Sequence, residues 1–189
     1  MTRLSINLNK IALLRNQRDV GYPDVLAMGR QALEAGANGL TVHPRPDRRH
    51  IRVEDVAAIS ELCNSWSDAE YNIEGYPDDD WLALVLRTKP DQATLVPDSP
   101  AAKTSDCGWD LKRGEIPLRN ALDQLVPAGI RVSIFMDYDA TNLAQLAEWG
   151  AARIELYTGP YARAKSDGKD LLTSYLAAAD LAHSAGLGV

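Results

Sequence analysis

The chain has 189 residues, of which 46% are hydrophobic and 24% charged, and its formal net charge is −6. This composition is typical of a globular domain, and the acidic balance argues against a nucleic-acid-binding protein, which needs a basic surface to neutralise phosphates. No stretch approaches the roughly 20 apolar residues that cross a bilayer, and the N-terminus lacks the apolar core of a secretory signal, so we expect no membrane partner.

Short apolar runs alternate with amphipathic ones along the whole chain. Strands are predicted at 4–8, 39–43, 71–74, 92–96, 131–136 and 153–157, and a seventh begins at 187. These runs are nearly continuously apolar, as expected of strands buried on both faces of a parallel sheet.

Helical patterns fill the intervals between the strands. The first has apolar positions at Val25, Met28, Gly29, Ala32 and Leu33, which lie on one helix face. Asp24 is its expected N-cap and Gly36 its expected stop. Similar helices are predicted at 53–63, 79–87, 117–125, 141–149 and 171–184. No linker-like segment divides the chain, so we expect one domain over residues 1–189.

A weak internal repeat supports a series of βα units. Segment 33–43 resembles segment 147–157, and a glycine precedes a predicted strand at Gly36, Gly129, Gly150 and Gly186. Such a repeat favours either a barrel or a doubly wound open sheet, and no G-x-G-x-x-G follows the first strand to indicate a dinucleotide site. Six strands and the start of a seventh are about three-quarters of a TIM (β/α)8 barrel of about 250 residues. We therefore predict an α/β TIM barrel whose C-terminal βα units are missing.

Polar residues gather where the predicted strands end, which is where TIM barrels carry their active sites. Asn7 and Asn9 follow the first strand, and their spacing in an extended chain would point both side chains the same way. They are either substrate-binding groups or a pair that hydrogen-bonds to neighbouring loops.

The segment after the second strand, 43–50, is the richest in chemistry. It contains His43, Arg45 and His50, together with two further arginines. Arginine binds phosphate and carboxylate groups bidentately, and histidine transfers protons near neutral pH. A solvated loop in which Asp47 pairs with Arg48 or Arg49 is the structural alternative.

Glu74 ends the third predicted strand, where a partly buried carboxylate is either a general base or one partner of an ion pair. Cys63 and Cys107 have neither metal-type spacing nor a visible base partner. We expect free thiols in a cytoplasmic protein, with no metal site.

Five blocks of the sequence, in order, resemble the pyridoxine 5′-phosphate synthase family. They are Asn7 to Asn16, Thr41 to Ile51, Asn72 to Pro77, Lys89 to Pro97 and Arg153 to Ala162. The resemblance covers nearly the whole chain.

The resemblance implies a TIM barrel assembled as a homo-octamer. It also implies condensation of 1-deoxy-D-xylulose 5-phosphate with 3-amino-2-oxopropyl phosphate, in vitamin B6 biosynthesis, with no metal or organic cofactor. The positions that match the family's proton acceptors are His43 and Glu74. Asn7 and Arg18 match positions that hold the aminoketone phosphate. The positions that match those holding the deoxyxylulose phosphate are Asn9, Lys10, Arg45, His50 and Thr104.

Two departures from the family pattern bear on activity. Many members have Asp-His where this chain has Asn9 and Lys10, and we interpret the difference as variation within the family. The family continues past Val189 into a seventh strand with a proton-donor histidine and then an eighth strand. If 189 residues are the complete polypeptide, the resemblance predicts little or no synthase activity.

Other functions remain open at this stage. One is a non-catalytic remnant of the family that binds phosphate esters or associates with complete subunits. Another is a different phosphosugar enzyme of barrel type. An aldolase would need a Schiff-base lysine, for which Lys10 is the only near candidate, and an epimerase would need a metal cluster or paired acids, which the sequence does not indicate.

Overall fold

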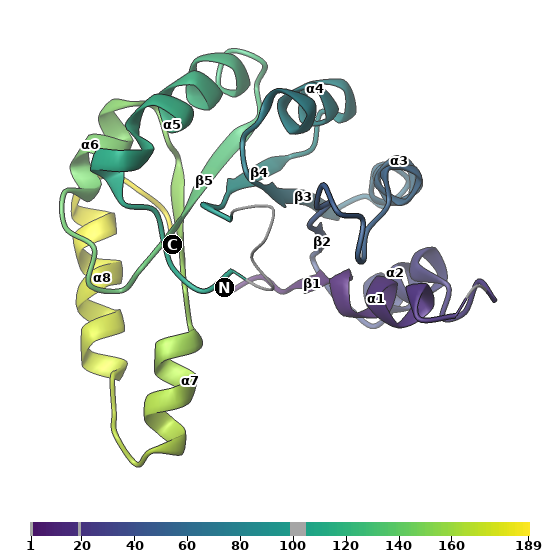
Figure 1. Cartoon of the computed structure of the whole chain (residues 1–189), viewed down its shortest axis with the longest axis horizontal. Helices are drawn as coiled ribbons and strands as arrows, with labels where there is room; N and C mark the ends of the chain where they lie inside the picture. Colours follow the sequence, from purple (N-terminus) through teal and green to yellow (C-terminus); the bar gives the residue numbers. More distant parts are fainter. Residues whose placement is uncertain (1, 19, 99–104) are drawn as a thin grey trace. The chain divides into compact units, whose positions relative to one another are not determined.

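The computed structural model describes residues 2–18, 20–98 and 105–189. Helices and strands alternate along the chain (Figure 1). The chain divides into two compact units. Unit 1 comprises Met1–Gly75 and Ala83–Ala93, and unit 2 comprises Tyr76–Leu82 and Thr94–Val189. Every candidate site residue from the sequence except Thr104 lies in unit 1.

Unit 1 contains three parallel βα repeats. Its elements in chain order are β1 (Ser5–Asn7), α1 (Asn9–Asn16), α2 (Val25–Glu34), β2 (Gly39–Val42), α3 (Val53–Asn64) and β3 (Glu70–Gly75). Strand β1 pairs in parallel with β2, and β2 with β3, so that Ser5 lies opposite Gly39 and Thr41 opposite Asn72. The carboxyl ends of these three strands therefore lie side by side.

Two elements cross the boundary between the units, and the remaining ones lie in unit 2. The boundary elements are α4 (Asp79–Thr88) and β4 (Gln92–Leu95). Unit 2 contains α5 (Leu111–Leu125), β5 (Arg131–Met136), α6 (Leu143–Glu148), β6 (Arg153–Leu156), α7 (Gly159–Ser166) and α8 (Leu172–Ser184). Strand β5 pairs in parallel with β6.

The strands follow one another in the sheet in the order β1-β2-β3-β4-β5-β6, which is also their order in the sequence. A doubly wound sheet reverses its strand order at a switch point, whereas a (β/α) barrel adds each strand beside the previous one. The sequential order decides between the two architectures that the repeat left open. The fold is α/β with six parallel strands, as in part of a TIM barrel.

The six predicted strands are confirmed to within two residues at each end. All four residues of β2 and of β4 are buried, as expected of strands covered on both faces, and Thr41, Gln92 and Thr94 are the polar residues among them. The predicted seventh strand is present only as an isolated parallel bridge between Arg153 and Gly188. Within the part of the chain that the structure describes, no helix has the length and apolar character needed to cross a bilayer.

The glycines that precede strands have the expected role. Gly36, Gly129, Gly150 and Gly186 all have positive φ, between 80° and 99°, a region that favours glycine because it has no Cβ. Each lies just after a helix and turns the chain toward the next strand. The predicted N-cap of α2 is also confirmed, since the Asp24 carboxylate accepts hydrogen bonds from the backbone N–H groups of Leu26 and Ala27.

Three helix predictions were wrong or incomplete. Helices α1 and α7 were not predicted, because both are short and lack a continuous apolar face. Helix α5 begins at Leu111, six residues before the predicted start at Pro117. The buried face of α5 continues through the proline from Leu111 to Leu125, and Asp110 caps the helix by accepting from the Lys112 N–H. Tertiary packing thus outweighs the local cost of Pro117.

Candidate active site

Three polar side chains meet at the carboxyl ends of β1, β2 and β3. Asn7 is the last residue of β1, His43 follows β2, and Glu74 lies near the end of β3. The His43 Nδ1 atom lies 3.7 Å from Glu74 Oε2, and the Asn7 side-chain amide lies 3.5 Å from the same carboxylate oxygen. Parallel pairing of neighbouring strands brings together residues that are more than thirty positions apart in sequence.

Asn7 and Asn9 lie at the turn between β1 and α1, and not on one face of a strand. The prediction that both side chains point the same way along a strand was wrong, because the strand ends at Asn7 and α1 begins at Asn9. The Asn7 side-chain oxygen accepts a hydrogen bond from the Asn9 N–H at 2.9 Å, which bends the chain into the helix. The Asn9 side-chain oxygen accepts from the His43 N–H at 2.8 Å. Asn9 therefore fixes the backbone that carries His43.

His43 is held in its neutral form. Its side chain is buried, and burial together with the positive charge of Arg45 lowers its pKa from 6.5 to about 3. The nearby His50 and Arg49 lower the pKa further. Despite the short distance to the Glu74 carboxylate, His43 carries no charge near neutral pH and has the capacity to accept a proton.

His50 and Arg45 are buried beside His43. The two imidazole rings meet edge to face with their centroids 6.0 Å apart. The His50 Nδ1 atom accepts a hydrogen bond from the Ile51 N–H at 3.0 Å, so the neutral ring carries its proton on Nε2. Burial and the Arg45 charge lower the pKa of His50 to about 4. Arg45 thus sets the electrostatic potential at both histidines.

Asp47 and Arg49 form the ion pair that the sequence offered as the structural alternative for this loop. The Arg49 guanidinium contacts the Asp47 carboxylate, and the pKa of Asp47 is lowered chiefly by this hydrogen bond. Arg48 adopts a left-handed conformation with φ of 53°. The structural alternative therefore holds for Asp47 and Arg49, whereas Arg45 and His50 are buried toward His43.

Two of the other predicted binding residues are exposed side chains of unit 1. Lys10 is exposed in the first turn of α1, and its charge contributes to the lowered pKa of His50. Arg18 is exposed just beyond the end of α1. Thr104 lies outside the described residues. The structure therefore brings together Asn7, Asn9, His43 and Glu74 most tightly. The charges of Arg45 and Lys10 are close enough to lower the pKa of His50.

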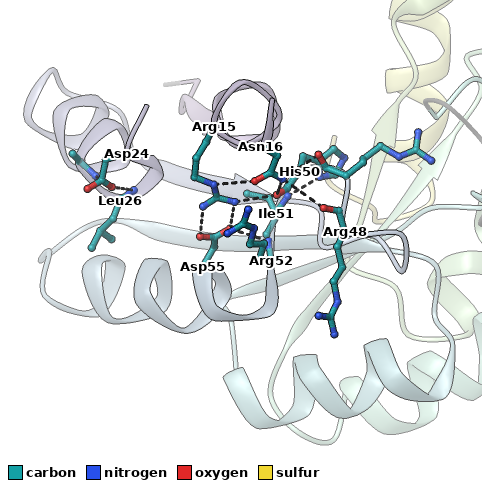
Figure 2. Close-up of polar contacts among 11 residues, drawn as sticks. Arg15, Asn16, Asp24, Leu26, Arg48, His50, Ile51, Arg52 and Asp55 are labelled. Carbon is teal, nitrogen blue, oxygen red and sulfur yellow. Dashed lines mark hydrogen bonds and ion pairs between the residues drawn. The ribbon is translucent and has the colours of Figure 1, made fainter. Parts of the chain in front are cut away.

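A second set of residues supports the site and was not singled out from the sequence. Arg15 of α1 contacts both its neighbour Asn16 and Asp55 of α3, and Arg15 and Asn16 also contact the loop after β2 (Figure 2). Arg15 pairs with Asp55 through both guanidinium NH2 groups, at 2.6 and 2.9 Å. Arg15 and Asn16 lie inside the first of the five sequence blocks, Asn7 to Asn16, but no local pattern indicates a partner 40 residues away.

Unit 2 contains a carboxyl group whose pKa is raised. Glu155 lies in the middle of β6, where burial raises the pKa of its carboxyl, and the Thr94 side chain on β4 hydrogen-bonds to it. A glutamate between the apolar residues Ile154 and Leu156 of a parallel strand is a signal in the sequence that its side chain needs a polar partner. Among the described residues, no group of three or more His, Cys, Asp or Glu side chains is arranged to hold a metal ion.

The sequence as a whole matches one protein family. The model described as "Pyridoxal phosphate biosynthesis protein PdxJ" matches residues 4–189. The chain belongs to this family. Among curated PdxJ relatives, the pyridoxine 5′-phosphate synthase of Agrobacterium fabrum is 50% identical over 193 residues, covering 99% of this chain and 77% of the relative. The synthase of Xylella fastidiosa is 47% identical over 197 residues, covering 100% of this chain and 75% of the relative.

Solved structures of lower similarity share the fold. A HMG-CoA lyase from Brucella melitensis has a TM-score of 0.62 at 13% identity and covers 97% of this chain and 69% of that protein. A mandelate oxidase structure has a TM-score of 0.60 at 14% identity, over 97% of this chain and 65% of that protein. At these identities the similarity concerns the α/β fold of this PdxJ family member and not its chemistry.

Proposed function

We propose that this PdxJ family member is a pyridoxine 5′-phosphate synthase, which condenses 1-deoxy-D-xylulose 5-phosphate with 3-amino-2-oxopropyl phosphate. The observation that carries the proposal is the pairing of a neutral, buried His43 with Glu74 at 3.7 Å, on adjacent strand ends. Relatives about half identical to the chain are named for this activity. We also propose that the fold is an eight-stranded TIM barrel.

The reaction requires repeated proton transfer, which suits this pair. An amine condenses with a ketone and releases water, inorganic phosphate leaves, and the pyridine ring closes to give pyridoxine 5′-phosphate. Each step removes or returns a proton at a carbon, nitrogen or oxygen atom. In the proposal, His43 and Glu74 are the proton acceptors, and the Asn7 amide orients the Glu74 carboxylate.

Substrate binding itself would shift the pKa of His43 toward a value suited to proton transfer. The Arg45 charge is the largest electrostatic cause of the lowered pKa of His43. A substrate phosphate that binds Arg45 adds negative charge nearby and opposes the field of the guanidinium. The pKa of His43 would then rise toward the range in which a base both accepts and retains a proton.

The residues that we propose to bind substrate suit negatively charged phosphate groups. We assign Arg45, His50, Asn9, Lys10 and Thr104 to the deoxyxylulose phosphate, and Asn7 and Arg18 to the aminoketone phosphate. The neutral His50 presents an Nε2–H donor, and the buried Arg45 guanidinium presents a charged one, both suited to phosphate oxygens. The chain as a whole is acidic, but Arg45 places positive charge beside both histidines, where it adds to the lowering of their pKa values by burial.

Assembly and location belong to the proposal as well. We propose a homo-octamer, in keeping with large exposed apolar side chains such as Ile116, Tyr22 and Val20 on the described surface. Light scattering tests it through a mass eight times that of the 20.6 kDa chain. We propose the cytoplasm as the compartment, because Cys63 and Cys107 are both unpaired thiols.

Single substitutions test the assignment of the proton acceptors. In His43→Ala we expect the turnover number to fall by roughly 100-fold or more, the usual contribution of a positioned acid or base, while the affinity for deoxyxylulose phosphate changes much less. Glu74→Gln should behave alike, and Arg113→Lys in the exposed part of α5 should be indistinguishable from the wild type. Equal losses of turnover and affinity in His43→Ala would assign His43 to binding instead. Substrate binding by the wild type without any product would favour the non-catalytic alternative.

A further inference from the structure

The loop after β2 is fastened to α1 through its backbone. The Asn16 side-chain amide donates to three consecutive carbonyl oxygens, those of Arg48 at 3.5 Å, Arg49 at 3.1 Å and His50 at 2.8 Å. Loop carbonyls in this number would otherwise need water or another donor. Figure 2 shows the Asn16 side chain directed at this turn. One amide thus determines the path of the chain on the N-terminal side of Ile51.

Arg15 determines which way that amide faces. Its Nε atom donates to the Asn16 side-chain oxygen at 3.1 Å, so the Asn16 NH2 group is turned toward the loop carbonyls. One terminal NH2 group of Arg15 also donates to the His50 carbonyl at 3.2 Å. His50 therefore receives two side-chain hydrogen bonds on a single carbonyl oxygen, from neighbouring residues of α1.

Asp55 anchors the arrangement to the start of α3. Both of its carboxylate oxygens accept from Arg15, and one of them also accepts from the Arg52 N–H at 2.8 Å, which closes the first turn of α3. The Arg15 and Asp55 side chains are only 11% and 14% exposed. Because the pair is planar, bidentate and shielded from water, it holds the Arg15 guanidinium in one orientation.

The chain of contacts ends at the His50 ring. The loop backbone fixed by Arg15 and Asn16 continues directly into Ile51, whose N–H donates to His50 Nδ1. This hydrogen bond leaves the proton on Nε2, on the other side of a ring that is itself buried and 6.0 Å from the ring of His43. A change in the loop backbone would free Nδ1 and allow the other tautomer.

We propose that Arg15, Asn16 and Asp55 are positioning residues that hold His50 as an Nε2–H donor for the phosphate of the deoxyxylulose substrate. We call these three residues the loop clamp. The proposal rests on the proposed function for the identity of the ligand, but the effect of the loop clamp on the His50 ring does not depend on it. The competing explanation is a purely stabilising role for a buried ion pair.

The test uses two clamp variants and one control. Asn16→Ala removes the donor to the three carbonyls, and Arg15→Lys keeps a positive charge beside Asp55 but loses the planar fork. Arg113→Lys, in an ion pair whose arginine side chain is 91% exposed, is the matched control. The readouts are the His50 tautomer from 15N–1H spectra, the affinity for 1-deoxy-D-xylulose 5-phosphate from calorimetry, and the thermal midpoint. Only three histidines need to be resolved in the spectra.

We expect wild type and Arg113→Lys to show a single Nε2–H tautomer of His50. Asn16→Ala should show a mixture of tautomers and bind the substrate roughly 10-fold more weakly, the effect of losing a buried hydrogen bond that aligns a binding group. Arg15→Lys should give a smaller change of the same kind, which keeps the test informative if Asn16→Ala does not fold. A lower thermal midpoint with unchanged tautomer and affinity would overturn the proposal and leave the loop clamp a stabilising feature. Failure of the wild type to bind the substrate would contradict the proposed function instead, and the tautomer measurement would still decide the role of the clamp.

Discussion

Acidification from pH 7 to pH 5 is expected to destabilise the fold through His43. The folded protein holds this imidazole neutral, because burial and Arg45 lower its pKa to about 3, whereas in the unfolded chain it titrates near 6.5. Below pH 6.5 the unfolded state takes up a proton that the folded state does not. The free energy of unfolding is therefore highest above about pH 6.5 and decreases as the pH falls toward 3.

The size of the effect follows from the difference in proton binding. Each pH unit over which only the unfolded state is protonated costs about 1.4 kcal/mol. Between pH 6.5 and pH 5 this gives about 2 kcal/mol for His43, which is only 5% exposed. His50, with a pKa lowered to about 4, adds a loss in the same direction over a narrower pH range.

Urea unfolding at both pH values, on the wild type and two variants, measures this loss. His43→Asn should lose about 2 kcal/mol less than the wild type on acidification, because it has no imidazole to protonate at this position. Arg113→Lys, at an exposed position in α5 that does not titrate between these pH values, should lose as much as the wild type. Equal losses in all three proteins, or an NMR titration of His43 with a midpoint near 6.5, would show that the fold does not hold His43 neutral.

Three further changes test the helix ends and the buried acid. Asp24→Ala should lower the free energy of unfolding by about 1 kcal/mol in urea titrations, because the carboxylate caps α2, whereas Asp24→Asn should retain most of it. Gly36→Ala should lower the free energy of unfolding by about 1 kcal/mol in the same measurement, because φ at this position is 99°. No atom lies within 4 Å of the added Cβ, so the cost comes from the backbone conformation alone. An unchanged free energy of unfolding would show that the backbone relaxes. Glu155→Gln should raise the thermal midpoint at pH 7, and should raise it by a smaller amount at pH 4. The pKa of Glu155 is raised in the folded protein, so ionisation of its carboxyl group opposes folding. A lower thermal midpoint of the variant at pH 7 would contradict this prediction.

The sequence predicted the strands well because their signals are local. Burial makes most of the strands rich in apolar residues, and a positive-φ glycine marks the turn before a strand at four places. The short helices α1 and α7 escaped prediction because they have no apolar face that a periodicity search recognises. The early start of α5 escaped it because a proline inside a helix is a poor local choice that buried contacts outweigh.

The sequence identified which residues meet at the candidate site, but it did not predict how they contact one another. Position at a strand end singled out Asn7, His43 and Glu74, and the structure brings these three together. The turn from Asn7 into α1 could not be inferred, because the decisive hydrogen bond from the Asn9 N–H competes with continuation of the strand. The pairing of Arg15 with Asp55 joins the last turn of α1 to the first turn of α3, and only the tertiary fold brings these two helix ends together.

The direct test of the central claim is product formation by the purified protein from 1-deoxy-D-xylulose 5-phosphate and 15N-labelled 3-amino-2-oxopropyl phosphate. The account predicts 15N-labelled pyridoxine 5′-phosphate and an equal amount of inorganic phosphate in the wild type, and a sharp decrease of both in His43→Ala and Glu74→Gln. Product formation at the same rate in His43→Ala as in the wild type would contradict the account, and so would a folded wild type that binds both substrates and forms no labelled product.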